Sequence, residues 1–110
     1  MAKPLNFKKI EKSYLPITFN DEKGTTILVG TPTKAILDEF ISYQDKIDDL
    51  EENRDATNDL FEICAKTMSR NKTGAKITRK YLESVFDMED IKIFFHAYIE
   101  FISEIVNSKN

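Results

Sequence analysis

Residues 91–106, IKIFFHAYIEFISEIV, carry the apolar pattern from which the fold prediction starts. Apolar residues recur there at the i, i+3, i+4 spacing of one helical face, at Ile91, Phe94, Phe95, Tyr98, Ile99, Ile102, Ile105 and Val106. Phe101 widens this face at its edge, and Ile93 and Ala97 lie nearly opposite it. A helix that is apolar on more than one side is either wedged into a core or needs a partner. The segment therefore predicts a helix whose surplus apolar surface indicates protein binding.

Four residues of this helix are candidates for partner contact. Ile93, Ala97 and Phe101 lie outside the principal stripe, so a client helix or a second copy of the chain could cover them. Tyr98 is a fourth candidate, although aromatic residues on a helical stripe more often belong to a core. We expect the remaining aromatic residues of the stripe to be core.

Upstream of the helices, residues 14–29 have the pattern of a β-hairpin. The first half alternates apolar residues with others at the period of a half-buried strand. Pro16 cannot donate a backbone hydrogen bond, which places this strand at a sheet edge. Residues 20–24, NDEKG, are typical of a turn, and residues 25–29, TTILV, favour a second strand. Because an open edge can add a strand from a neighbour, we expect self-association.

Residues 31–107 predict about four helices. Pro32 fits the first turn of the first helix, whose apolar stripe extends to about Leu50. Asp87, followed by Asp90 three residues later, resembles an acidic capping arrangement at the start of the last helix, where the helix dipole favours carboxylates. The expected N-caps, in chain order, are Thr31, Asp55 or Thr57, Thr78 and Asp87.

These elements predict one α+β domain over residues 1–110, predominantly helical, with an N-terminal β-hairpin (14–29) followed by about four helices (31–107). The short stretch before the hairpin is ambiguous. Phe7 and Ile10 suggest one helical turn that docks on the core.

Composition narrows the class of protein. The chain has 110 residues and one cysteine, which forbids an internal disulfide, and it has no signal-type or membrane-spanning apolar run. We therefore expect a soluble, reduced, intracellular protein that binds no membrane. The net charge is −3, with eight acids between Asp38 and Asp55 and six bases between Lys66 and Lys80. Such blocks are usually solvated faces, and they can also attract each other or other copies.

The sequence shows no catalytic, metal-binding or cofactor-binding constellation. His96 has no partner at metal-ligand spacing, and Cys64 lies on an apolar stripe, where a free cysteine usually acts as a small core residue. The acidic stretch from Asp45 has Leu50 where a calcium loop needs glycine. We therefore expect that the protein is not an enzyme and binds no cofactor.

The basic segment 66–80 leaves one nucleic-acid alternative open. It joins two predicted helices through a loop that contains Gly74, an arrangement that loosely resembles a helix-turn-helix. The connection from Asn71 to Thr78 is longer than the usual three or four residues, and the chain is acidic overall. A small DNA-binding regulator is therefore the less favoured alternative, and we expect no nucleic-acid partner.

Four blocks of the chain resemble a known family. They are Lys23-Gly24-Thr25-Thr26, Gly30-Thr31-Pro32-Thr33-Lys34, residues 68–78 (MSRNKTGAKIT), and Phe94-Phe95-His96-Ala97-Tyr98 with Phe101-Ile102-Ser103-Glu104-Ile105. Together they are similar to the tail assembly chaperones of long-tailed bacteriophages and prophages of Gram-positive hosts. The resemblance extends over essentially the whole chain and includes no catalytic pattern.

The resemblance implies a non-enzymatic chaperone that binds the tape-measure protein and promotes assembly of the tail tube from its subunits. It also implies a protein of the host cytoplasm that is absent from the mature virion. A structural or tail-completion protein of the phage is the alternative within the same system.

Overall fold

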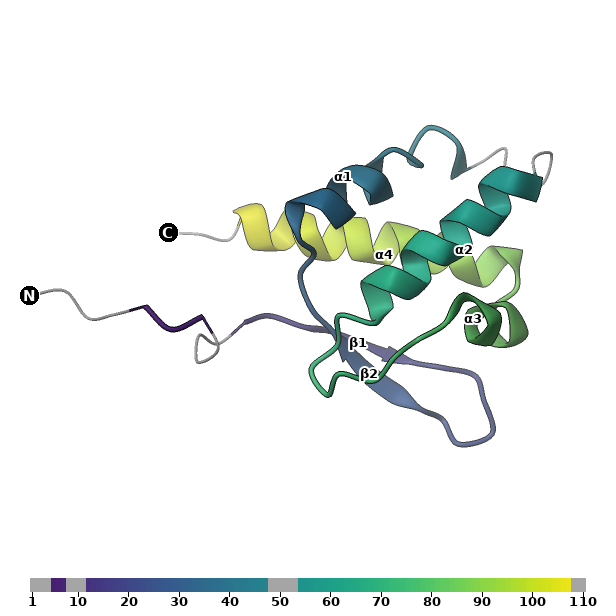
Figure 1. The fold of residues 1–110 in the computed structure, drawn as a ribbon, viewed down its shortest axis with the longest axis horizontal. Helices are drawn as coiled ribbons and strands as arrows, with labels where there is room; N and C mark the ends of the chain where they lie inside the picture. Colours follow the sequence, from purple (N-terminus) through teal and green to yellow (C-terminus); the bar gives the residue numbers. More distant parts are fainter. Residues whose placement is uncertain (1–4, 8–11, 48–53, 108–110) are drawn as a thin grey trace, which may run out of the picture.

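The computed structural model describes residues 5–7, 12–47 and 54–107, which form a two-stranded antiparallel sheet followed by four helices (Figure 1). The elements are β1 (Leu15–Thr18), β2 (Thr26–Val29), α1 (Lys34–Ile41), α2 (Arg54–Met68), α3 (Arg79–Val85) and α4 (Met88–Asn107). This arrangement confirms the prediction of a predominantly helical α+β fold with an N-terminal hairpin. None of the described helices is long and apolar enough to cross a membrane.

The hairpin is short and is closed by one carboxylate. Its strands pair from Leu15↔Val29 to Thr18↔Thr26. In the turn, the carboxylate of Asp21 accepts the backbone N–H of Thr25 at 2.9 Å and the hydroxyl of the same residue at 2.7 Å. Gly24 has a φ of 60°, which a residue without a Cβ adopts readily. The predicted turn therefore forms where it was expected.

The two edges of the sheet differ. At the outer edge of β2, the N–H of Gly30 donates to the carbonyl of Arg70 at 2.6 Å, and the N–H of Lys72 donates to the carbonyl of Leu28 at 2.9 Å. Within the described ranges, β1 pairs only with β2, so its outer edge is open. Pro16 therefore lies on an edge strand, as predicted.

Asn71 orders the connection between α2 and α3. Its side-chain amide donates to the carbonyl of Met68 at 2.9 Å and to the carbonyl of Ala75 at 2.6 Å. Its Oδ1 accepts the N–H of Ala75 at 2.9 Å and the hydroxyl of Thr73 at 3.0 Å. Because these bonds satisfy backbone groups that no helix covers, the chain can keep a defined course there without regular structure.

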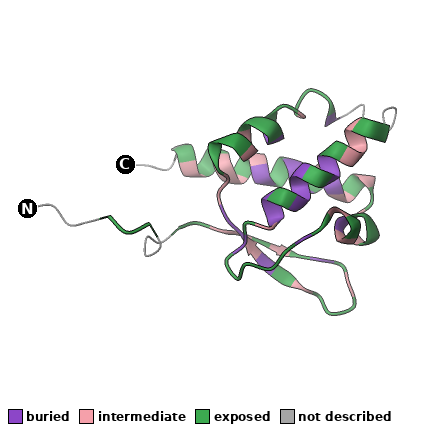
Figure 2. Ribbon diagram, viewed as in Figure 1, coloured by how far each residue is buried: buried purple, intermediate pink, exposed green. Residues whose placement is uncertain are grey.

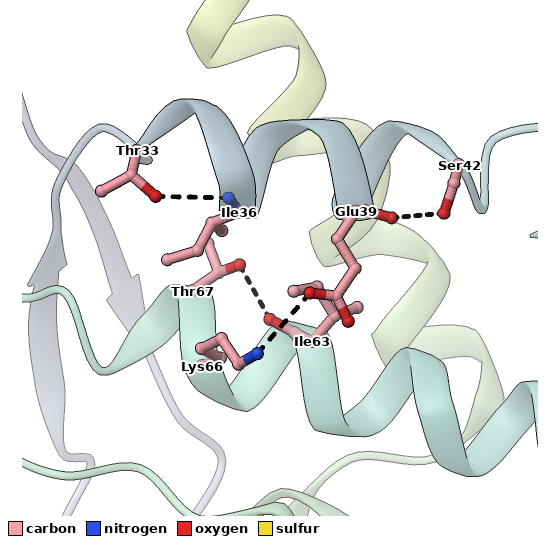
Figure 3. Close-up of polar contacts among 7 residues, drawn as sticks. All are labelled: Thr33, Ile36, Glu39, Ser42, Ile63, Lys66 and Thr67. Atoms are coloured by element: carbon pink, nitrogen blue, oxygen red, sulfur yellow. Dashed lines mark hydrogen bonds and ion pairs between the residues drawn. The ribbon is translucent and has the colours of Figure 1, made fainter.

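The N-cap predicted for the first helix is wrong by two residues. The hydroxyl of Thr33 accepts the N–H of Ile36 at 3.2 Å and caps α1 (Figure 3). The carbonyl of Thr31 instead accepts a hydrogen bond from Nε of Arg70 at 2.9 Å. A long-range contact to Arg70, which follows α2, therefore holds Thr31 in the segment before the helix.

The first helix also ends earlier than predicted. The hydroxyl of Ser42 donates to the carbonyl of Glu39 at 2.6 Å (Figure 3). The N–H of Tyr43 donates to the carbonyl of Phe40 at 3.2 Å. These bonds replace the next helical bond, and the chain continues as turns over residues 42–46. The end of the predicted helix, residues 48–50, lies outside the described residues.

The caps predicted for the last two helices are confirmed. The hydroxyl of Thr78 accepts the N–H of Tyr81 at 3.1 Å. Asp87 and Asp90 form a reciprocal cap, in which each carboxylate accepts the N–H of the other residue, at 2.8 and 3.0 Å. By contrast, α2 begins at Arg54, so both caps expected for it lie inside the helix: Asp55 and Thr57.

The core lies where α1 and α2 pack against α4 (Figures 1 and 2). The ring of Phe40 stacks on that of Phe95 with centroids 4.4 Å apart. Phe94 and Tyr98 meet the ring of Phe40 edge-on. The buried residues of α2 are Leu60, Phe61, Ile63, Cys64, Ala65, Thr67 and Met68.

The helical turn suggested by Phe7 and Ile10 is not borne out in its described part. Residues 5–7 are not helical, and Phe7 is 68% exposed, so its ring does not dock on the core. Ile10 lies outside the described residues.

Candidate docking surface

The structure separates the four candidate contact residues into two groups. Ile93 is 61% exposed and Ala97 is exposed, whereas Phe101 is half-buried against the edge of the core. Tyr98 is fully buried, and its hydroxyl donates to the carbonyl of Gly30 at 2.7 Å. The prediction that Tyr98 contacts a partner is therefore wrong, because its polar end is used inside the fold to satisfy a buried backbone group.

The remaining three residues form a strip along α4 that faces β1. Ile93 and Ala97 line a hollow of about 260 Å³ together with Pro16, Ile17, Thr18, Phe86, Asp90 and Phe94. Phe101 lines a second hollow of about 400 Å³ together with Ser13, Tyr14, Leu15, Glu104 and Ile105. Each hollow has the strand on one wall and the helix on the other. We call these two hollows together the β1–α4 groove.

The open edge of β1 is poorly suited to pairing with a further strand. The N–H of Phe19 donates to the carbonyl of Thr25 at 2.8 Å, so these two residues form a hydrogen-bonded pair. Along an antiparallel ladder, hydrogen-bonded pairs alternate with pairs whose backbone groups face away from the partner strand. By that alternation, Pro16 and Thr18 direct their backbone groups toward the open edge. Pro16 has no N–H to offer there. The groove therefore favours an occupant that binds through side chains, such as a helix, over an added strand.

Acidic residues border the groove. Asp90 lines one hollow and Glu104 lines the other, and Glu100 is exposed on the same helix, one turn after Ala97. An apolar strip with a carboxylate rim suits an amphipathic helix that carries lysine or arginine beside its apolar face.

Other candidate chemistry gains no support from the geometry. Cys64 is fully buried, and burial raises the pKa of its thiol, which disfavours the thiolate that a nucleophile needs. His96 is exposed on α4 and packs beside the ring of Phe95. In the part of the chain that the structure describes, no group of three histidine, cysteine or acidic side chains could hold a metal ion.

The basic segment 66–80 is largely engaged within the molecule. Nζ of Lys66 lies 3.5 Å from the carboxylate of Glu39 on α1 (Figure 3), and Nε of Arg79 lies 3.4 Å from that of Glu83. Nζ of Lys72 lies 5.7 Å from the ring centre of Tyr14. In addition, α3 has only seven residues. This arrangement does not favour a recognition helix for DNA.

Sequence reasoning identified the strip on α4 but missed the strand wall of the groove. Pro16 signalled an edge strand, yet nothing in the sequence indicated which helix that edge would lie beside. Compared with models of known protein families, with curated proteins and with solved structures, the chain gives no match.

Proposed function

We propose that this protein is a non-enzymatic tail assembly chaperone that binds the tape-measure protein of a long-tailed phage and promotes assembly of the tail tube around it. The observation that carries the proposal is the apolar strip of the β1–α4 groove, in which Ile93 is 61% exposed although it lies beside a well-packed core. The resemblance in sequence supplies the identity of the client.

The physical demands of the task match such a groove. A long helical client exposes a repeating apolar stripe before the tube covers it, and that stripe needs a temporary cover. The strip on α4 has the i, i+4, i+8 spacing at which a helix presents a row of side chains to a partner helix. Each groove is small, so individual contacts are weak. Many copies along one client would supply avidity.

The client segment that fits best is an amphipathic helix with basic residues beside its apolar face. Asp90 and Glu104 would attract such a segment, and they would repel a client with an acidic border. In this proposal the protein acts in the host cytoplasm and leaves before the virion is complete.

A direct test uses Ile93→Asp. This change puts a charge into the strip while leaving the core intact, so co-expression should no longer keep the tape-measure protein soluble, and the thermal melt should stay close to that of the wild type. The matched control is Ile41→Asp, because Ile41 is 43% exposed on α1, away from the groove. If Ile93→Asp solubilises the client as well as the wild type does, the groove is not the binding site.

Mass spectrometry of purified virions separates the chaperone from the alternative within the phage. A chaperone is missing from the particle, whereas a structural or tail-completion protein is present in a fixed copy number. Detection of the chain at a fixed copy number per virion would overturn the chaperone proposal in favour of the structural one.

A further inference from the structure

A hollow of about 770 Å³ lies between α2 and the connection that leads from α2 to α3. One wall consists of Glu62, Ala65 and Lys66 of α2 together with Ser69, which follows the helix. The opposite wall consists of Gly74 and residues 76–80. We call this surface the α2–α3 hollow. None of these residues lines the β1–α4 groove, so the hollow is a second, separate surface.

The two walls of the hollow are held together by Ser69. Its hydroxyl accepts the N–H of Ile77 at 2.9 Å and donates to the carbonyl of the same residue at 3.0 Å, so the connection returns beside the end of α2 (Figure 1). Thr78 then caps α3, and Asn71 orders the preceding turn. Because these bonds fix both walls in the free protein, a ligand would lose little affinity to the ordering of this surface.

Basic side chains dominate the α2–α3 hollow. Among the described residues that line it, one is an acid, Glu62, and four are bases: Lys66, Lys76, Arg79 and Lys80. Lys66 and Arg79 already have acidic neighbours within the molecule. Lys76 and Lys80 are exposed, and neither forms an ion pair within the ranges that the structure describes. Their charges are therefore available to an anionic partner.

The floor of the hollow is apolar. It is formed by Ala65 and Ile77, which are 2% and 8% exposed, and the alkyl stems of the lysines extend this apolar lining. A sugar-phosphate backbone would leave such a floor without a contact. A peptide can instead place an apolar side chain on the floor between two carboxylates. The hollow therefore favours an acidic peptide over a nucleic acid, in agreement with the short α3.

We propose that the α2–α3 hollow binds an acidic segment of a partner protein, with carboxylates beside Lys76 and Lys80 and one apolar side chain over Ala65 and Ile77. Because single exposed ion pairs are weak, the segment needs several acids, and its binding weakens as the salt concentration rises. This segment is opposite in charge to the basic helix that suits the β1–α4 groove. The proposal does not depend on the chaperone function.

Fluorescence anisotropy of the full chain with a labelled peptide tests this assignment. The probe is a short peptide in which glutamates flank one central leucine. Lys76→Glu/Lys80→Glu should weaken its binding by about tenfold or more, because two attractive charges become repulsive. The matched control is Lys34→Glu/Lys46→Glu, which makes the same change in net charge on exposed lysines outside the hollow. At physiological salt, where distant charges are screened, this control should bind within about twofold of the wild type.

Changes in the probe separate the apolar contact from the charge. Replacing the central leucine with glycine should weaken binding, and so should replacing the glutamates with glutamines. A single-stranded oligonucleotide of equal charge should bind more weakly than the peptide. The milder variant Lys76→Gln/Lys80→Gln should lose less affinity than the double reversal. Thermal melts within a few degrees of the wild type would show that the loss of binding is not unfolding.

Backbone amide NMR signals locate the bound peptide. On addition of the probe, the signals of Gly74, Ile77 and Thr78 should shift, whereas those of Ile93 and Ala97 in the β1–α4 groove should not. For the same reason, Ile93→Asp should bind the acidic peptide like the wild type. Failure of this proposal and failure of the chaperone proposal are therefore distinguishable.

Any of five results would overturn the proposal. The wild type does not bind the probe, the double reversal binds it like the wild type, the glycine probe binds as tightly as the leucine probe, the oligonucleotide binds as tightly as the peptide, or the shifted signals lie on α4. Self-association of the chain that Lys76→Glu/Lys80→Glu abolishes would also overturn it, because a second copy would then be the occupant of the hollow.

Discussion

The two longest helices of the described residues, α2 and α4, both carry an apolar stripe, but they differ in how much of it is buried. All the large apolar residues of α2 are buried, whereas α4 leaves Ile93 and Val106 exposed. The reason is position. α2 contacts α1, α3, α4 and β2. One side of α4 instead borders a hollow that it shares with β1 and Phe86, and its last turns extend past the other helices. Amphipathic periodicity thus identifies a face that needs cover, and the topology decides how much of it the chain can cover itself.

The sharpest test of this difference compares two residues of α4 that lie on its covered and uncovered sides. Phe95→Ala should lower the free energy of unfolding by about 3–5 kcal/mol, because it removes a fully buried ring that stacks on Phe40. Ile93→Ala should change it by less than about 0.5 kcal/mol, as exposed substitutions usually do. Urea denaturation measures both. Equal losses for the two variants would mean that the uncovered side of α4 is also core.

Tyr98 offers a second test, because it was a candidate for partner contact and lies in the core. Tyr98→Phe keeps the ring and removes the hydroxyl that satisfies the carbonyl of Gly30, so stability should fall by about 1–3 kcal/mol. Tyr43→Phe is the matched control, because Tyr43 is only half-buried. Its loss in the same urea titration should stay below about 0.5 kcal/mol. A loss for Tyr98→Phe no larger than that of the control would show that the buried hydrogen bond contributes nothing net.

The start of α4 should be stable without any partner, in contrast to its end. Asp87→Ala removes one half of the reciprocal cap and should cost about 1 kcal/mol. The comparison variant is Asp87→Asn, which keeps an oxygen that can accept the N–H of Asp90 and should lose less than the alanine variant. Thermal unfolding followed by circular dichroism measures both. An equal loss for Asp87→Asn and Asp87→Ala would show that the cap acts through charge rather than through the hydrogen bond, because both variants remove the charge and only asparagine keeps the acceptor.

Sequence patterns predicted what depends on neighbours along the chain. The stripe of α4, the hairpin, and the caps at Thr78 and Asp87 all follow from residues within a few positions of one another. Two of the errors involve distant contacts, whereas the early end of α1 depends on hydrogen bonds between near neighbours. Thr31 was expected to cap the first helix, but its carbonyl accepts a hydrogen bond from Arg70. Tyr98 was a candidate for partner contact, but its hydroxyl donates to the carbonyl of Gly30. Only the α4 side of the groove was predicted, because its residues follow one helical period. The β1 side was missed, because the contact between strand and helix joins distant parts of the chain.

The hairpin repeats the contrast between covered and open surfaces at a smaller scale, because β2 is held by residues 70–72 while the turn is tied mainly by Asp21. The N–H of Thr25 is the main cause that lowers the pKa of Asp21 to about 2, and the hydroxyls of Thr25 and Tyr81 add to it. A carboxyl whose pKa is lower in the folded state stabilises the fold above its ordinary pKa of 3.8, and this contribution is lost as the pH falls toward 2.

Tyr81→Phe should therefore move the pKa of Asp21 upward in a carboxyl-carbon NMR titration and narrow the pH range over which the turn stays closed. The control is again Tyr43→Phe. If Asp21 titrates near 3.8 in the wild type, the carboxylate does not close the hairpin, and the hairpin must be held from the β2 side alone.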